Sequence, residues 1–155
     1  MTYKEYRENR QKEFNVLPIF YAFSNEQFEK AITERGLTMD NIKGNVYRFG
    51  DTGGFYLKKD APIIHDYCNK DLDSELRNIM NSDADFARDA FVYEMYNHEY
   101  PINWQGDWDV AICFGNVEYE EEKSGAVYLK EMGYNDSVIE QWYSARKEVI
   151  NADIW

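Results

Sequence analysis

The chain has 155 residues, of which 44% are hydrophobic, and its 29 acidic residues against 17 basic ones give a formal net charge of −12. This surplus weighs against a nucleic-acid binder, which needs clustered cations to neutralise phosphates, and no apolar run approaches the ~18 residues of a membrane span. A length of this size predicts one compact domain over residues 1–155. We expect the protein in the cytoplasm, because its two cysteines form no disulfide framework and suit a reducing compartment.

Helical patterns alternate with short apolar runs in the amino-terminal part of the chain. The predicted elements are, in order, a polar helix over residues 2–15, an apolar strand over 17–23, a helix over 25–35, and a hairpin that pairs 46–49 with 55–57. Ser24 and Gln27 have the spacing of a capping box, which marks the start of the second helix. The glycines between the two runs of the hairpin permit the positive φ angles of a tight turn.

The remainder of the chain is predicted to be mainly helical. After a helix that begins near Asp60 and includes residues 63–68, we predict helices over 74–80 and 82–96, a strand over 108–114, and helices over 124–132 and 137–151. The strand is inferred from the apolar run WDVAICF. Together these elements predict an α+β fold, in which a small, mainly antiparallel sheet of about three or four strands packs against several helices.

The acidic residues are unevenly distributed along the sequence. Residues 71–122 contain 14 acidic side chains but only Arg77 and Arg88 as basic ones, so this segment alone sums to −12, whereas residues 1–50 hold 8 basic and 7 acidic side chains. A concentration of negative charge repels anions and attracts cationic surfaces. Two interpretations stay open: a surface that keeps the protein in solution, or an interaction face for a basic partner.

A second cluster, rich in polar and aromatic residues, spans residues 97–109. If Asp107 and Asp109 begin a strand, its two-residue period places both on one face. There they could join His98 and Glu99 in a ligand pocket, in acid–base catalysis or around a metal ion. The simpler interpretation is that the Asp and Asn side chains satisfy backbone donors in an irregular loop. A zinc site is not expected, because the chain has only two histidines.

Other motifs are not taken as functional sites. Asp51-Thr52-Gly53 matches the tripeptide of aspartic proteases but fits a glycine-rich turn, and residues 71–75 lack the later glycine and glutamate of a calcium loop. Cys68 and Cys113 follow or lie within apolar segments, where a thiol is usually a small buried side chain. We therefore expect no catalytic residue, no metal and no cofactor.

Three stretches carry a resemblance to a known family: LPIFYAFSNEQFEKA (17–31), GGFYLKKDAP (53–62) and NHEYPINWQGDWDV (97–110). With these motifs, over roughly residues 4–145, the chain resembles a family of small uncharacterised proteins, a domain of unknown function. Such proteins occur in Gram-positive bacteria and in their phages and mobile elements. The resemblance implies a context in which short acidic proteins often blunt host defence by occupying a nucleic-acid-binding surface, and it carries over no catalytic residue.

These observations predict a non-enzymatic protein-binding protein that docks on a basic surface of a host protein, such as the channel of a restriction or CRISPR nuclease, without binding nucleic acid or membrane itself. The expected contacts are Asp83, Asp85, Asp89, Glu94, Glu118, Glu120, Glu121 and Glu122, with Trp104 and Tyr119 as anchors. Two alternatives remain: an enzyme or ligand-binding domain built on His98, Glu99, Asp107 and Asp109, and a phage housekeeping protein with a solvated acidic face.

Overall fold

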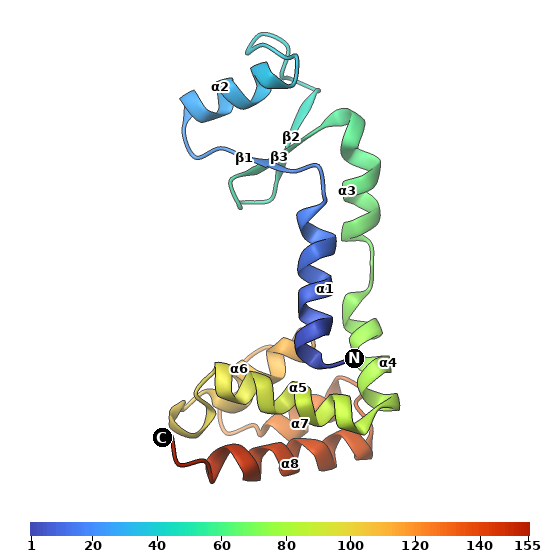
Figure 1. Ribbon diagram of the computed structural model, residues 1–155, viewed down its shortest axis with the longest axis vertical. Helices are drawn as coiled ribbons and strands as arrows, with labels where there is room; N and C mark the ends of the chain where they lie inside the picture. Colours follow the sequence, from blue (N-terminus) through green and yellow to red (C-terminus); the bar gives the residue numbers. More distant parts are fainter. The chain divides into compact units, whose positions relative to one another are not determined.

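A computed structural model describes all 155 residues and has an α+β fold with a three-stranded antiparallel sheet, which confirms the predicted fold class (Figure 1). The chain forms two compact units. The helical unit contains residues 1–10 and 71–155, and the sheet unit contains residues 11–70. Helix α1 (Tyr3–Asn15) contributes residues to both. The expectation of a single domain stays a prediction.

The sheet unit is built on an aromatic core. Its elements are β1 (Phe20–Tyr21), α2 (Asn25–Glu34), β2 (Val46–Phe49), β3 (Gly54–Leu57), the short 3-10 helix Lys58–Asp60 and α3 (Ala61–Cys68). The strand order is β1-β3-β2, and the predicted hairpin is confirmed by antiparallel pairing of β2 with β3. Phe55 stacks on Phe20 and contacts Phe28 of α2, which fixes that helix on the sheet.

The helical unit is centred on two long helices. Its elements after α1 are α4 (Leu72–Ser82), α5 (Ala84–Asn97), the 3-10 helix Tyr100–Ile102, α6 (Gly106–Ala111), the 3-10 helix Ile112–Phe114, α7 (Gly125–Glu131) and α8 (Asp136–Ile150). Helices α5 and α8 pack along one another (Figure 1). Between them Phe91 meets the ring of Trp142 edge-on at 5.3 Å, and both side chains are fully buried. No helix of the protein is both long and apolar enough to cross a membrane.

The predicted strand over 108–114 is wrong, because this segment is helical. Val110, Ala111 and Phe114 are buried while Ile112 is exposed, which is the spacing of one helical face rather than the alternation of a strand. A short apolar run is compatible with either structure, and here the tertiary contacts select the helix. Asp107 and Asp109 therefore lie in the first turn of α6, and their side chains point in different directions.

Candidate functional site

A groove on the helical unit brings together several of the predicted contact residues. It has a volume of about 380 Å³ and is formed by the segment 100–108, the segment 119–124 and the carboxyl-terminal end of α8. Its lining includes Tyr100, Trp104, Trp108, Tyr119 and Tyr128 as aromatic residues and Asp107, Glu120 and Glu122 as acidic ones. We call it the aromatic–acidic groove.

Three aromatic rings form the open wall of the groove. The ring of Tyr119 stands nearly perpendicular to both indoles, at 5.9 Å from Trp108 and 6.4 Å from Trp104. Trp108 is held in place because its Nε1 donates a hydrogen bond to the carbonyl oxygen of Val117 at 3.0 Å. Trp104 is 83% exposed, which is exceptional for so large an apolar side chain. Trp104 and Tyr119 therefore expose aromatic surface to solvent, whereas Trp108 is half-buried.

The backbone around the groove is fixed by specific contacts. The hydroxyl of Tyr128 on α7 accepts a hydrogen bond from the Glu120 amide at 2.8 Å and donates one to the Glu120 carbonyl at 3.0 Å. On the other side α6 begins at the buried Gly106, where a Cβ atom would lie 3.0 Å from the carbonyl oxygen of Tyr100. Only glycine allows this approach without displacing the backbone.

Of the two cations that line the groove, Lys123 is ion-paired and Arg146 is hydrogen-bonded. Lys123 forms ion pairs with Glu120 and with Glu131. Arg146 donates from Nε to the hydroxyl of Tyr100 at 3.1 Å, and this hydroxyl in turn donates to Asp107. Burial, together with the bond to Asp107, raises the pKa of Tyr100 well above its usual range, so it stays a hydrogen-bond donor. The exposed carboxylate of Glu122 makes no ion pair.

The other predicted contacts lie outside the groove. Asp83 caps the amino terminus of α5, accepting from the Phe86 amide at 3.0 Å, and Asp89 accepts from the backbone amide of Tyr3 at 2.8 Å. Asp85 is exposed on α5. Glu118 and Glu121 are exposed and are neighbours in sequence of residues that line the groove, but they do not line it themselves. The structure thus brings together four predicted contacts: Trp104, Tyr119, Glu120 and Glu122.

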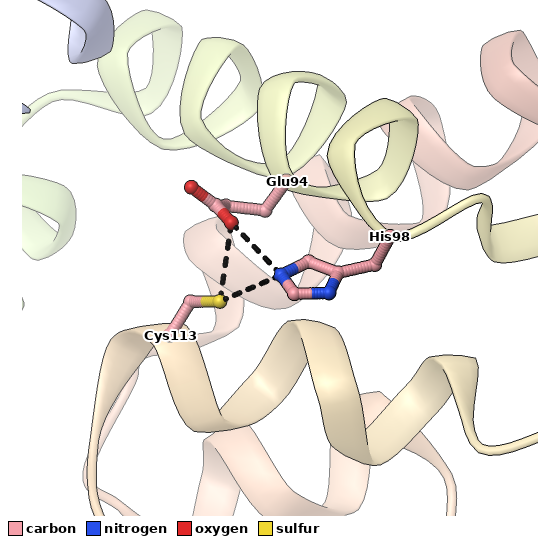
Figure 2. A group of neighbouring side chains, drawn as sticks. All are labelled: Glu94, His98 and Cys113. Carbon is pink, nitrogen blue, oxygen red and sulfur yellow. Dashed lines mark hydrogen bonds and ion pairs between the residues drawn. The ribbon is translucent and has the colours of Figure 1, made fainter.

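The prediction that Glu94 contacts a partner at the surface is wrong, because its side chain is fully buried. One carboxylate oxygen, Oε1, accepts from the Tyr3 hydroxyl at 3.1 Å and from Arg7. The other, Oε2, lies 3.1 Å from the Cys113 sulfur and 3.2 Å from His98 Nε2 (Figure 2). The carboxylate can be buried because polar groups from α1, from the carboxyl-terminal cap of α5 and from the 3-10 helix after α6 surround it.

Cys113 does not have the environment of a catalytic nucleophile. Burial, reinforced by the hydrogen bond to Glu94 and its negative charge, raises the pKa of the Cys113 thiol to about 12. A reactive cysteine needs a lowered pKa, because the thiolate is the attacking species. The imidazole is also not arranged as a relay, since the same atom, His98 Nε2, faces both the sulfur and the carboxylate.

The four residues of the predicted alternative pocket do not share one cavity. Asp107 faces the groove, whereas Asn103 links the other side of the segment by donating from Nδ2 to Asp109 at 2.8 Å and to the His98 carbonyl at 3.0 Å. Glu99 is exposed, with a left-handed φ of 50°. The helical form of 106–111 causes this separation, because alternate residues of a helix point to different faces.

Sequence reasoning missed Tyr3, Arg7 and Cys113 as neighbours of Glu94. One partial signal was available: His98 follows Glu94 by four residues, just beyond the predicted helix over 82–96, and continuing that helix by a half turn places the two side chains on one face. No local pattern indicates the rest, because Tyr3 and Arg7 precede Glu94 by 91 and 87 residues and Cys113 follows it by 19.

Residues 2–126 match the profile of a family of unknown function, DUF7659. The chain belongs to this family. The match covers most of the chain and includes both Glu94, His98 and Cys113 and most of the groove, but it assigns no activity to any of them. No curated protein and no solved structure matches the chain.

Proposed function

We propose that this DUF7659 protein is a non-enzymatic protein-binding protein that takes a basic side chain of its partner into the aromatic–acidic groove. The observation that carries the proposal is the gathering of Trp104, Tyr119, Glu120 and Glu122 around one cavity. A groove of this volume is near the lower end of the range for small-molecule sites, roughly 300–1,000 Å³, and suits a single long side chain.

The chemistry of the groove favours a cation. Aromatic faces attract ammonium and guanidinium groups through their quadrupoles, an effect that is strongest for tryptophan. The carboxylate of Glu122 adds a negative charge that no cation of the chain neutralises, whereas Lys123 and Arg146 are already held by neighbours. A lysine or arginine side chain therefore fits better than an anion.

The distribution of charge supports a basic partner surface. The helical unit, which contains the groove, has 21 acidic and 9 basic side chains, whereas the sheet unit has 8 of each. The whole net charge of −12 thus belongs to the helical unit. Such a field accelerates encounter with a cationic protein and repels nucleic acid.

The partner we propose is a basic host protein in the bacterial cytoplasm, and more specifically a defence nuclease whose nucleic-acid channel the acidic surface would occupy. Support comes from the charge of the helical unit and from the resemblance to phage and mobile-element proteins. In this proposal binding competes with DNA or RNA, so the complex should weaken as the salt concentration rises.

The groove can be tested with an immobilised oligoarginine peptide as a defined probe. Trp104→Ala removes an exposed side chain and should weaken binding by about tenfold or more, the effect of a residue at the centre of an interface. Tyr143→Ala, an exposed tyrosine on α8 outside the groove, is the matched control. Equal affinity of wild type and Trp104→Ala would refute the groove as the docking site.

The charge contribution needs its own pair of variants. Glu122→Lys should reduce binding, whereas Glu140→Lys, an equal change of net charge on α8 outside the groove, should reduce it much less. Reversal of Asp85, Glu120 and Glu121 to lysine then tests the wider acidic surface in a pull-down from host extract. Loss of every captured protein supports the proposal, and unchanged capture by this folded variant favours the housekeeping alternative.

A further inference from the structure

The Glu94 cluster has a second property besides its hydrogen bonds, because three different donor atoms converge on one point. Glu94 Oε2, His98 Nε2 and Cys113 Sγ are separated by 3.1, 3.2 and 3.4 Å (Figure 2). In a tetrahedral zinc site, ligand atoms at bond lengths of ~2.0–2.3 Å lie roughly 3.3–3.6 Å apart. Adjustments of a few tenths of an ångström would therefore bring the three donor atoms to three corners of a tetrahedron around one metal ion.

We propose that Glu94, His98 and Cys113 form a binding site for a divalent transition-metal ion with the ligand preferences of zinc. The inference is independent of the proposed docking function, since none of the three residues lines the aromatic–acidic groove. It departs from our sequence-based expectation of no metal, which rested on the number of histidines and took no account of a buried carboxylate.

The two oxygen atoms of the Glu94 carboxylate have different partners, which suits a metal ligand. Oε1 is occupied by Arg7 and by the hydroxyl of Tyr3, so the side chain is oriented from behind. Oε2 is left facing the thiol and the imidazole. Metal-binding carboxylates are typically held by such outer hydrogen bonds, which fix the direction of the free lone pair.

The scaffold holds the three ligands on ordered elements. Glu94 lies on α5, His98 is the residue that caps the carboxyl-terminal end of this helix one turn later, and Cys113 lies in the 3-10 helix that follows α6. Asn103 restrains the backbone of His98 through its carbonyl oxygen at 3.0 Å. The geometry thus does not depend on a mobile loop.

Access is provided on the histidine side of the cluster. The side chain of His98 is 31% exposed, whereas that of Glu94 is 1% exposed. An ion can therefore reach the three donor atoms, and the fourth position of a tetrahedron is left for water or another small ligand. Three protein ligands with an open position are the pattern of reactive zinc sites rather than of purely structural ones.

The donor set selects the kind of metal. A thiolate and an imidazole are poor ligands for Ca²⁺ and Mg²⁺, which prefer oxygen, but they suit Zn²⁺ and its spectroscopic substitute Co²⁺. On binding, the sulfur–hydrogen bond of Cys113 breaks, a sulfur–metal bond forms, and the proton passes to the buffer. His98 binds as the neutral imidazole through the lone pair of Nε2, with its one ring proton on Nδ1; moving this proton from Nε2 to Nδ1 through solvent releases none.

The experiment uses the full chain without a histidine tag, freed of metal by a chelator and then titrated with Co²⁺. We expect saturation at one ion per chain and the intense visible bands of a tetrahedral Co²⁺ site together with a thiolate-to-metal charge-transfer band in the near ultraviolet. Zn²⁺ should displace Co²⁺ and erase this spectrum. Absence of the thiolate band in the wild-type protein would overturn the proposal without reference to any variant.

The chain supplies matched controls because it has two cysteines and two histidines. Cys113→Ser and His98→Gln should each weaken Co²⁺ binding by at least ~100-fold, since even outer-shell changes cost 10–100-fold. Cys68→Ser and His65→Gln, both exposed residues of the sheet unit, should leave the affinity unchanged. Circular dichroism checks that all four variants are folded, and equal affinity across them would show that the cluster is only hydrogen-bonded.

Discussion

Replacing Arg7 with methionine tests whether the buried carboxylate of Glu94 anchors the start of α1 in the helical unit. The variant keeps most of the length of the side chain but removes its charge. Arg7 forms an ion pair with Glu94 Oε1, and its guanidinium lies 5.2 Å from the ring centre of Tyr93. Methionine can replace the packing on the ring but not the ion pair.

The size of the effect follows from what is left around the carboxylate. Removing one partner of a buried ion pair costs about 3–5 kcal/mol when the remaining charge is uncompensated. Here Glu94 keeps the donors of Tyr3, His98 and Cys113, and the side chain of Arg7 is 45% exposed. We therefore expect Arg7→Met to lower the free energy of unfolding by about 2–3 kcal/mol, below the full value for a buried pair.

Urea unfolding followed by tryptophan fluorescence measures this effect in the relevant unit. All four tryptophans, at positions 104, 108, 142 and 155, belong to the helical unit. With a slope of about 2 kcal/mol per molar urea, the midpoint should fall by about 1–1.5 M. Lys4→Met, an exposed lysine on the same helix, is the control and should shift it by less than about 0.25 M.

A double-mutant cycle with Glu94→Gln separates the ion pair from packing. If the two side chains interact as described, the combined variant should lose about 1–3 kcal/mol less than the sum of the single losses. Additivity within about 0.5 kcal/mol, or an Arg7→Met midpoint equal to that of Lys4→Met, would refute the reasoning.

Three further predictions concern the core and the thiols. Gly125→Ala should lower the free energy of unfolding by about 1–3 kcal/mol, because the new Cβ would lie 2.0 Å from a ring carbon of the buried Trp142. In urea unfolding, the double variant with Trp142→Phe should recover part of this loss. In metal-free native protein at pH 8, a thiol reagent should modify one cysteine per chain rapidly, and Cys68→Ser should abolish this phase, because Cys68 is exposed while the pKa of Cys113 is raised to about 12. Because the pKa of the Cys113 thiol is raised on folding, the protonated thiol stabilises the folded protein, and this contribution to the free energy of unfolding is complete below about pH 9 and is lost as the pH approaches about 12. Cys113→Ala should flatten this part of the plot of urea midpoint against pH. An identical plot for the variant would contradict the assignment.

Local signals in the sequence predict the beginnings of helices and the hairpin well. Ser24 accepts from the Gln27 amide at 3.1 Å, as in a capping box, whereas Gln27 Oε1 reaches one residue further back and accepts from the Phe23 amide at 2.9 Å. The antiparallel pairing of Val46 with Leu57 likewise follows from two apolar runs around a glycine-rich turn. These features depend on residues close together in the chain.

Features that depend on distant contacts were not predictable in the same way. The segment 108–114 is apolar enough for a strand, and only its packing in the helical unit makes it a helix. Glu94 resembles the other acidic residues of its segment, and its burial depends on Arg7 and Tyr3, which lie 87 and 91 residues earlier. The groove residues Trp104, Tyr119, Glu120 and Glu122 were identified individually from charge and aromatic character, whereas their shared cavity required the fold.

The division of the chain into residues 1–10 with 71–155 and residues 11–70 has a consequence for biosynthesis. The sheet unit is continuous in sequence, so it can fold on the ribosome as soon as its last strand and helix have emerged. The first ten residues must wait for α5 and for Phe114, whose ring lies 5.9 Å from that of Tyr3, so their native contacts close loops of up to about 110 residues and form late. During that interval Tyr3 and Tyr6, both buried in the folded helical unit, have apolar surface in contact with water.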